Sequence, residues 1–157
     1  MVAVTVAALS EPAAAQLAEV AVVFDQYRQH YGQASGGGRT LAWLTEHTGQ
    51  GRLIVFTACI GEELAGLATA VSIPASQRLG CFWQLRDLYV VPAARRCGAG
   101  RALLEAVRQA AAEAGAIRLS VQTEPGNSGA LQLYRTAGFI PVEDLCVLSL
   151  PLRRDGT

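Results

Sequence analysis

The chain has 157 residues, a mass of 16.5 kDa and 51% hydrophobic residues. Thirteen basic residues, all arginine, balance thirteen acidic ones, so no long-range field would draw the protein to nucleic acid or to an anionic membrane. The four cysteines are widely spaced without a C-x-x-C pair, so neither a zinc knuckle nor a disulfide framework is indicated. We expect one domain over residues 1–157, with reduced thiols, no metal, and neither nucleic acid nor membrane as a partner.

The N-terminal segment VAVTVAAL is rich in β-branched residues and predicts a strand. Ser10 and Pro12 predict the cap and first turn of a helix that runs to about Tyr31. The first basic residue is Arg28, whereas a targeting peptide needs a positive start, and no apolar run reaches the roughly eighteen residues of a membrane helix. We therefore expect a cytoplasmic protein.

Glycines and serine at 32–38 interrupt this helix, and residues 39–49 predict a second, shorter one. Two apolar runs at 52–60 and 64–73, joined by Gly-Glu-Glu, indicate a hairpin. CFWQLRDLYVV at 81–91 predicts a fourth strand, which ends before Pro92.

The residues after 100 place apolar side chains on one helical face and charged ones opposite, until Gly115 ends the helix. A fifth strand is predicted at 116–123, and Asn127 caps a last helix that ends at Gly138. FIPV (139–142) and CVLSLPL (146–152) predict two more strands. This order predicts an α/β fold with a single mixed, mostly antiparallel six- to seven-stranded sheet, flanked by about four helices. The fourth strand, its helix and the fifth strand form a parallel crossover.

The loop RRCGAG at 95–100 lies between a strand and a helix, where free backbone N–H groups and the helix dipole favour an anion such as phosphate. Gly98 and Gly100 allow close approach, and neighbouring arginines add forked donors. A Walker loop needs a lysine, which the chain lacks, and a dinucleotide fingerprint needs a third glycine where Leu103 stands. The pattern that remains is R-x-x-G-x-G.

This stretch resembles the GNAT superfamily of acetyl-CoA-dependent N-acetyltransferases, whose pyrophosphate loop is [QR]-x-x-G-x-[GA] after a strand ending in L-x-V. Here Leu88 and Val90 lie in the strand and Arg95 begins the loop. A second motif, N-x-x-A-x-x-x-Y-x-x-x-G-F, is similar to NSGALQLYRTAGF at 127–139. Both motifs occur in the family's order over residues 82–140. The resemblance implies the acyl-CoA N-acyltransferase fold and acetyl-CoA as cosubstrate.

The resemblance also implies the residues that bind acetyl-CoA. The Val90 backbone N–H would polarise the thioester carbonyl, because family members separate the fourth and fifth strands. The residues expected to contact the cosubstrate are Leu88, Tyr89, Val90, Arg95, Arg96, Cys97, Gly98, Ala99, Gly100, Arg101, Asn127 and Tyr134. Two positions depart from the family pattern, since Arg96 replaces a common glycine and Ala99 a larger aliphatic residue. We also expect Cys97 to be reactive, because a helix N-terminus and arginines favour a thiolate.

Tyr134 is the candidate proton donor for the departing thiolate, because the family tyrosine reaches the sulfur. Its alternative is a core tyrosine packed under the last strands. Asp87 is the candidate base or ammonium anchor, since many members carry an acidic residue nearby on this strand; its alternative is a structural salt bridge. The neighbouring site, often glutamate in the family, is Arg86 here.

The expected reaction is acetyl transfer to a primary amine of a small molecule. Acetylation of a protein or peptide remains an alternative, and so does a non-catalytic acyl-CoA-binding sensor. Tyr27 and Tyr31 line the acceptor pocket or form a packed i, i+4 pair. The apolar segment at 146–152 either supplies a homodimer edge, as later strands do in many relatives, or is covered within one subunit; we expect a homodimer.

Overall fold

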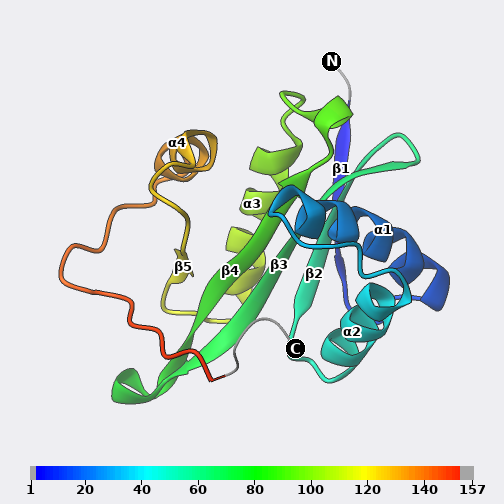
Figure 1. The fold of residues 1–157 in the computed structure, drawn as a ribbon. Helices are drawn as coiled ribbons and strands as arrows, with labels where there is room; N and C mark the ends of the chain where they lie inside the picture. The colour runs from blue at the N-terminus through cyan, green and yellow to red at the C-terminus, as the bar shows by residue number, and fades with distance from the viewer. Residues whose placement is uncertain (1–2, 153–157) are drawn as a thin grey trace.

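A computed structural model describes residues 3–152 of the chain. Figure 1 shows their arrangement, with the elements coloured from the N-terminus to the C-terminus. Among these residues, no helix has the length and apolar character needed to cross a membrane. In chain order, the strands and α-helices are β1 (Val4–Leu9), α1 (Ala14–His30), α2 (Gly38–Gly49), β2 (Ile54–Ile60), β3 (Glu63–Ala75), β4 (Gly80–Val90), α3 (Ala99–Glu113), β5 (Leu119–Val121) and α4 (Ser128–Thr136).

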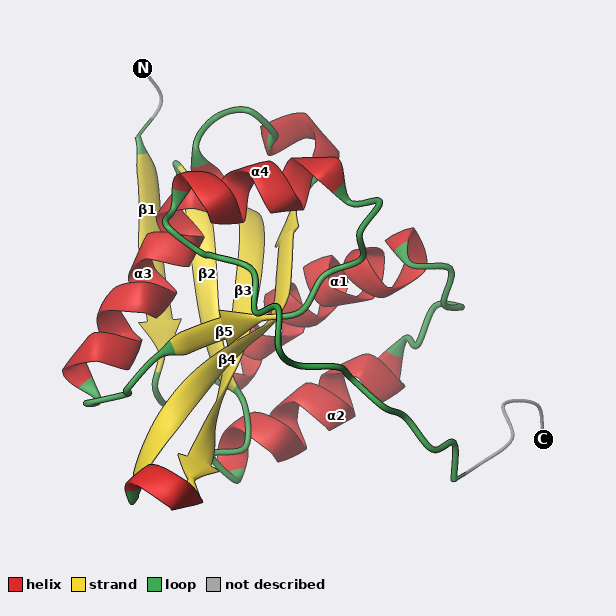
Figure 2. Ribbon diagram, turned by 90° about the vertical axis from the view of Figure 1, so that its left-hand side faces the viewer, coloured by secondary structure: helices red, strands yellow, loops and turns green. Residues whose placement is uncertain are grey.

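The five strands form one sheet in the order β1-β2-β3-β4-β5. Neighbours from β1 to β4 are antiparallel, whereas β4 and β5 run parallel. This confirms the predicted α/β fold, with its mixed, mostly antiparallel sheet, and the crossover through α3. In Figure 2, the sheet separates α3 from α1 and α2.

The sheet divides two apolar cores. On one face, the predicted apolar face of α3 buries Leu103, Leu104 and Val107 against strand residues that include Phe56 and Leu85. On the other face, α1 and α2 pack against the sheet through Val20, Phe24 and Leu44, together with Val55 and Leu67. Burying such side chains contributes on the order of 1.5–3 kcal/mol each, so the cores hold the helices to the sheet.

The prediction of two final strands is wrong for the described residues. Residues 139–152 pair with no strand and follow α4 as an extended loop outside the sheet (Figure 1). Their composition favours strands, but a strand needs a partner, and this segment has none within residues 3–152. Its large apolar side chains are 66–89% exposed: Ile140, Val142, Leu145, Val147, Leu148, Leu150 and Leu152. The described sheet therefore has five strands, against six to seven predicted.

Two element boundaries also differ from the prediction. Ser10 does not cap α1, because the helix begins later, with Ala13 at the N-cap position and no side-chain cap. The fifth strand covers Leu119–Val121 only, shorter than 116–123. The predicted Asn127 cap is confirmed, since its side-chain oxygen accepts a 3.3 Å hydrogen bond from the Ala130 N–H.

A β-bulge interrupts β4 at Arg86. Thr69 of β3 lies opposite Asp87, whereas the next β3 residue, Ala70, lies opposite Leu85. The extra residue shifts the side-chain alternation by one, so that Leu85 and Leu88 both face the core under α3. The bulge therefore sets which β4 side chains face each side of the sheet beyond Leu85.

Candidate active site between β4 and β5

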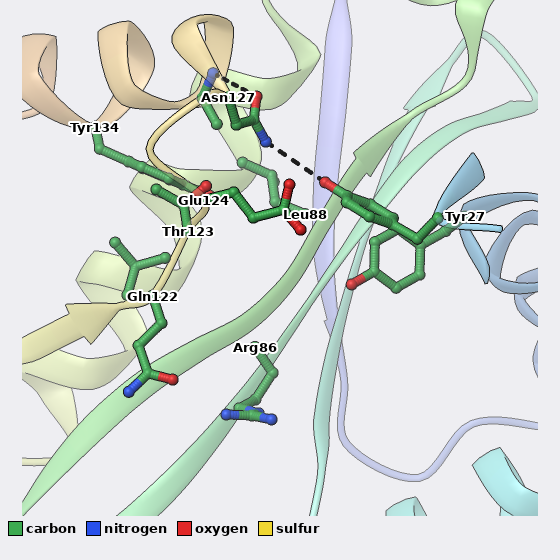
Figure 3. Close-up of a pocket in the computed structure, with 11 residues that line it drawn as sticks. Tyr27, Arg86, Leu88, Gln122, Thr123, Glu124, Asn127 and Tyr134 are labelled. Carbon is green, nitrogen blue, oxygen red and sulfur yellow. Dashed lines mark hydrogen bonds between the residues drawn. The ribbon is translucent and has the colours of Figure 1, made fainter. Parts of the chain in front are cut away.

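A pocket opens where β4 and β5 separate. The two strands pair only through residues 83–85 and 119–121, although β4 continues to Val90. The pocket has a volume of about 220 Å³. Its walls come from α1, β4, the segment after β5 and α4 (Figure 3), and its lining residues are Tyr27, Tyr31, Arg86, Leu88, Val121, Gln122, Thr123, Glu124, Asn127, Ala130 and Tyr134.

The strand separation leaves a backbone donor facing this gap. The Val91 N–H donates to the Ala65 carbonyl of β3 at 2.9 Å. Because successive N–H groups point to opposite edges of a strand, the Val90 N–H points away from β3, toward the side that β5 has left. This geometry fits the role expected for Val90. Leu88 also lines the pocket, whereas the Tyr89 side chain is buried in the core beneath α1.

Tyr134 enters the pocket from α4, opposite Tyr27 from α1 (Figure 3). It is 8% exposed and packs against Phe139, with ring centroids 5.6 Å apart. Burial raises the pKa of Tyr134 to about 12, and the nearby Tyr31 adds to the shift. The hydroxyl is therefore protonated at neutral pH. No group within residues 3–152 hydrogen-bonds to it, so it is available to a ligand.

Tyr27 and Tyr31 both line the pocket and pack on each other edge-to-face, with ring centroids 5.2 Å apart. The packed i, i+4 pair is therefore confirmed, and both rings also line this pocket; contact with an acceptor stays a prediction. Asn127 spans the pocket mouth, because its Nδ2 donates to the Tyr31 hydroxyl at 3.5 Å while its Oδ1 caps α4. The end of α1 is thereby linked to the start of α4.

The N-terminus of α3 is open toward solvent. Gly98 caps it in the left-handed conformation at φ +86°, and no side chain caps the helix. Within the described residues, the N–H groups of Ala99, Gly100 and Arg101 have no hydrogen-bond acceptor, and Ala102 is the first to bond, to the Gly98 carbonyl. A Cβ on Gly100 would lie 3.6 Å from Leu133 and 3.7 Å from Val90. The helix end therefore lies beside the end of β4 and beside α4.

The loop arginines are exposed but oriented differently. Arg95 folds back, so that its Nε donates to the Val90 carbonyl at 3.2 Å. Arg96 has a positive φ of +66°, which is uncommon outside glycine, and Arg101 lies in the first turn of α3. Cys97 is also exposed, with its Sγ 3.7 Å from the Arg95 carbonyl oxygen. Its expected reactivity stays a prediction.

Asp87 lies between two hydroxyl donors. The Tyr27 hydroxyl donates to its Oδ1 at 2.7 Å, and the buried Thr69 hydroxyl donates to its Oδ2. Burial raises the pKa of Tyr27, and the Asp87 carboxylate adds to this shift. Asp87 does not line the pocket, while its partner Tyr27 does. Its contacts favour the structural alternative, with hydroxyl partners in place of the salt bridge considered; a direct catalytic role stays a prediction.

Two charged lining residues were not predicted as site residues. Glu124 follows β5, and Arg86 stands at the β4 bulge. The sequence held a signal for each. Glu124 lies just past a strand in a crossover unit, where the carboxyl ends of parallel strands commonly bind ligands. The apolar alternation in β4 slips by one residue between Leu85 and Leu88, which indicates a bulge.

The loop between α1 and α2 is organised by a buried carboxylate. Asp25 accepts hydrogen bonds from the Ser35 hydroxyl at 2.6 Å and the Gly36 N–H at 2.9 Å. The Thr40 hydroxyl and the Arg28 guanidinium also donate to it, at 2.9 and 2.7 Å. These bonds, that of Ser35 foremost, lower the pKa of Asp25 well below its usual range. A Cβ on Gly36 would collide with Thr40, so this tight loop requires glycine there.

Comparisons with a family model and with known relatives agree on one family. Residues 18–139 match the model of the Acetyltransferase (GNAT) family. An uncharacterized N-acetyltransferase of Bacillus subtilis (strain 168), YhfO, is 34% identical over 122 residues, which are 78% of this chain and 82% of the relative. A thialysine N-epsilon-acetyltransferase of Caenorhabditis elegans is 33% identical over 85 residues, which are 54% of this chain and 52% of that relative.

Solved structures share the fold. The crystal structure of a probable acetyltransferase superposes with a TM-score of 0.86 at 27% identity, covering 98% of this chain and 99% of the other. An aminoglycoside acetyltransferase from an uncultured soil metagenomic sample, in complex with sisomicin, has a TM-score of 0.80 at 18% identity. The match covers 96% of this chain and 97% of the other. At that lower identity, only the fold is comparable.

Proposed function

Because the chain belongs to the GNAT family of acetyltransferases, we propose that it transfers an acetyl group from acetyl-CoA to a primary amine of a small molecule. One observation carries the proposal: the gap between β4 and β5 lies beside an open helix N-terminus and presents the Tyr134 hydroxyl to a pocket. The relatives support the acceptor chemistry, since YhfO is named an N-acetyltransferase and the nematode protein is named for an amine of thialysine.

The residues at the α3 N-terminus fit the diphosphate of acetyl-CoA. Three successive N–H groups, from Ala99 to Arg101, lack an acceptor within residues 3–152. The helix dipole adds roughly half a positive charge there, and Arg96 and Arg101 supply guanidinium groups. Gly98 and Gly100 carry no side chain that would hold an oxyanion away from these donors. We propose that this helix end binds the diphosphate, so that the acyl end of the cosubstrate reaches the pocket.

Acetyl-CoA supplies an activated thioester. The amine nitrogen forms a bond to the thioester carbonyl carbon, the carbon–sulfur bond breaks, and the sulfur departs with the bonding electron pair. We propose that the Val90 N–H donates to the carbonyl oxygen as negative charge develops on it. An ammonium acceptor loses two protons in total. One balances the proton that the thiol product carries on sulfur, and the other is released to water.

Tyr134 is proposed to donate to the departing sulfur. Its pKa of about 12 lies above the value of about 8.5 for a free thiol. Full transfer of the proton from Tyr134 to the thiolate, which leaves tyrosinate, would therefore cost on the order of 5 kcal/mol. The hydroxyl stabilises the developing thiolate by a hydrogen bond, and proton transfer is completed only as a proton from the ammonium returns to Tyr134.

The test is thiol release from acetyl-CoA with a panel of small amines, amino acids and peptides, for the wild type and Tyr134→Phe. We expect turnover of small amines and a fall in kcat of about 10²-fold or more in the variant. The KM for acetyl-CoA should change little, because the hydroxyl acts mainly on the sulfur. Thermal unfolding of both proteins checks that the variant is folded.

The alternatives predict different results. A peptide acetyltransferase would turn over peptides far better than any small amine. A sensor module would bind CoA in calorimetry but release no thiol with any acceptor. An unchanged kcat in Tyr134→Phe would remove Tyr134 from the mechanism.

A further inference from the structure

One basic and one acidic side chain line the pocket. Arg86 and Glu124 both line it, and neither belongs to an ion pair within residues 3–152. Among the described residues, the one hydrogen bond of the Arg86 guanidinium goes to the neutral amide oxygen of Gln84, at 3.1 Å. Both side chains therefore keep free hydrogen-bonding capacity toward a ligand.

The two charges come from different walls of the pocket. Arg86 projects from β4 at the bulge, and Glu124 projects from the segment after β5. Figure 3 shows the Glu124 carboxylate pointing across the pocket toward Leu88 and Tyr27, while Arg86 lies apart from it. A molecule in the pocket can thus meet a carboxylate at one end and a guanidinium at the other.

Among the described residues that line the pocket, Glu124 is the only carboxylate. Asp87 is held by Tyr27 and Thr69 and does not line it. Glu124 is therefore the acidic group best placed to contact an amine.

We propose that the acceptor is a zwitterion, a primary amine that also carries a carboxylate, as amino acids do. Arg86 binds its carboxylate and Glu124 binds its ammonium group; this rests on the function proposed above. A guanidinium matches a carboxylate through two parallel hydrogen bonds, and the exposed Tyr31 ring adds a face for the cation.

The same charges disfavour other acceptor classes. A diamine would bring its second ammonium group toward Arg86, and like charges a few ångströms apart repel each other. A dicarboxylate would meet Glu124 in the same way. Only a ligand that carries at least one group of each sign satisfies both walls.

The experiment compares acceptors that differ by one carboxylate: lysine with cadaverine, ornithine with putrescine, and phenylalanine with phenethylamine. Thiol release gives kcat and KM for the wild type, Arg86→Gln, Arg86→Glu and Glu124→Gln. Arg52→Gln, in an exposed turn outside the pocket, is the matched control. Thermal unfolding verifies that each variant is folded.

We expect the carboxylate-bearing member of at least one pair to have a KM at least tenfold lower in the wild type and in Arg52→Gln. Arg86→Gln should abolish that difference with kcat largely kept, and Arg86→Glu should reverse it in favour of the diamines. Glu124→Gln should raise the KM of both members of a pair.

The inference is overturned if thiol is released but every decarboxylated acceptor performs as well as its partner, or if Arg86→Gln preserves the difference. Absence of thiol release with all acceptors would instead contradict the proposed function itself.

Discussion

The Tyr27 hydroxyl donates a 2.7 Å hydrogen bond to Oδ1 of Asp87, a residue 60 positions away in sequence. Thr69, which is 0% exposed, donates to the other carboxylate oxygen. One carboxylate of β4 therefore fixes a pocket tyrosine of α1 and satisfies a buried hydroxyl of β3. Its removal would affect both the fold and the pocket.

The first prediction concerns this contact. Asp87→Ala leaves two hydroxyls without their acceptor and should lower the free energy of unfolding by about 1–3 kcal/mol. In a double-mutant cycle with Tyr27→Phe, we expect a coupling energy of at least about 0.5 kcal/mol, measured by urea unfolding.

Kinetics of the same variants separate the two roles of Asp87. If Asp87 acts only by positioning Tyr27, Asp87→Asn should change kcat little when it is added to Tyr27→Phe. A full additional loss in that background would establish a direct catalytic role for Asp87.

The second prediction concerns alkaline pH. The folded-state pKa of Tyr134, about 12, exceeds its unfolded value of about 10. The resulting stability is fully present below pH ~10 and is lost as the pH rises toward about 12. The unfolding free energy should therefore fall over this window, and less steeply in Tyr134→Phe. Guanidinium unfolding at stepped pH measures both slopes; parallel slopes would contradict the assignment.

The third prediction concerns Gly98. Its φ of +86° is unfavourable for any residue with a Cβ. Gly98→Ala should lower stability by roughly 1–2 kcal/mol and raise the KM for acetyl-CoA, because the first turn of α3 shifts. Gly49→Ala is the matched control: that glycine lies in the last turn of α2 without a positive φ and has open space around it. Equal effects of the two substitutions would show that the left-handed conformation is unimportant.

The fourth prediction concerns acid pH. Hydrogen bonds, chiefly from Ser35, depress the pKa of Asp25, so its contribution to stability is present above its ordinary pKa of about 4 and is lost as the pH falls further. Asp25→Asn should be less stable than the wild type at pH 7, with the difference shrinking below pH ~4. Glu46→Gln, an exposed change on α2 outside the loop between α1 and α2, is the control in thermal unfolding. A difference that is independent of pH would argue against a charged Asp25 in the loop.

The fifth prediction concerns assembly. Residues 140–152 expose seven large apolar side chains, and the outer edge of β5 has no partner strand within residues 3–152. We expect a homodimer in which this segment pairs with the β5 edge of a second copy. Leu148→Glu should yield a monomer in sedimentation experiments, whereas Val22→Glu, an exposed position on α1, should not. A monomeric wild type at all concentrations would refute the dimer.

Local signals in the sequence were sufficient for most of the fold. Pro92 after β4, Gly115 after α3 and Asn127 before α4 each act on neighbouring residues, so the ends of these elements were predicted well. The segment 146–152 failed because its composition shows a preference for strands but not whether a partner lies within reach. The Tyr27–Asp87 contact also escaped prediction, since it depends on how α1 lies over the sheet.

The residues of the candidate site likewise separate into those that local sequence signals predicted and those that depend on the whole sheet. Tyr134 and Asn127 lie seven residues apart on one helix, and their shared presence in the pocket followed from helical spacing. Glu124 and Arg86 both line this pocket only because β4 and β5 separate, and that separation is a property of the whole sheet. The bulge at Arg86 was visible as a slip in the apolar alternation, and this slip is the signal to seek in similar strands.

Within the described residues, only three residue pairs join β5 to β4, so the β4 main chain from Arg86 to Val90 has no strand on that side and is open to a guest. An amide-bearing molecule inserted in this wedge would serve as a missing strand, and the sheet would be continuous only in the complex. A ligand that binds only the folded chain raises its stability in proportion to ln(1 + [L]/Kd). Because we propose acetyl-CoA as this molecule, the resistance of the protein to heat and proteolysis should rise with the concentration of acetyl-CoA.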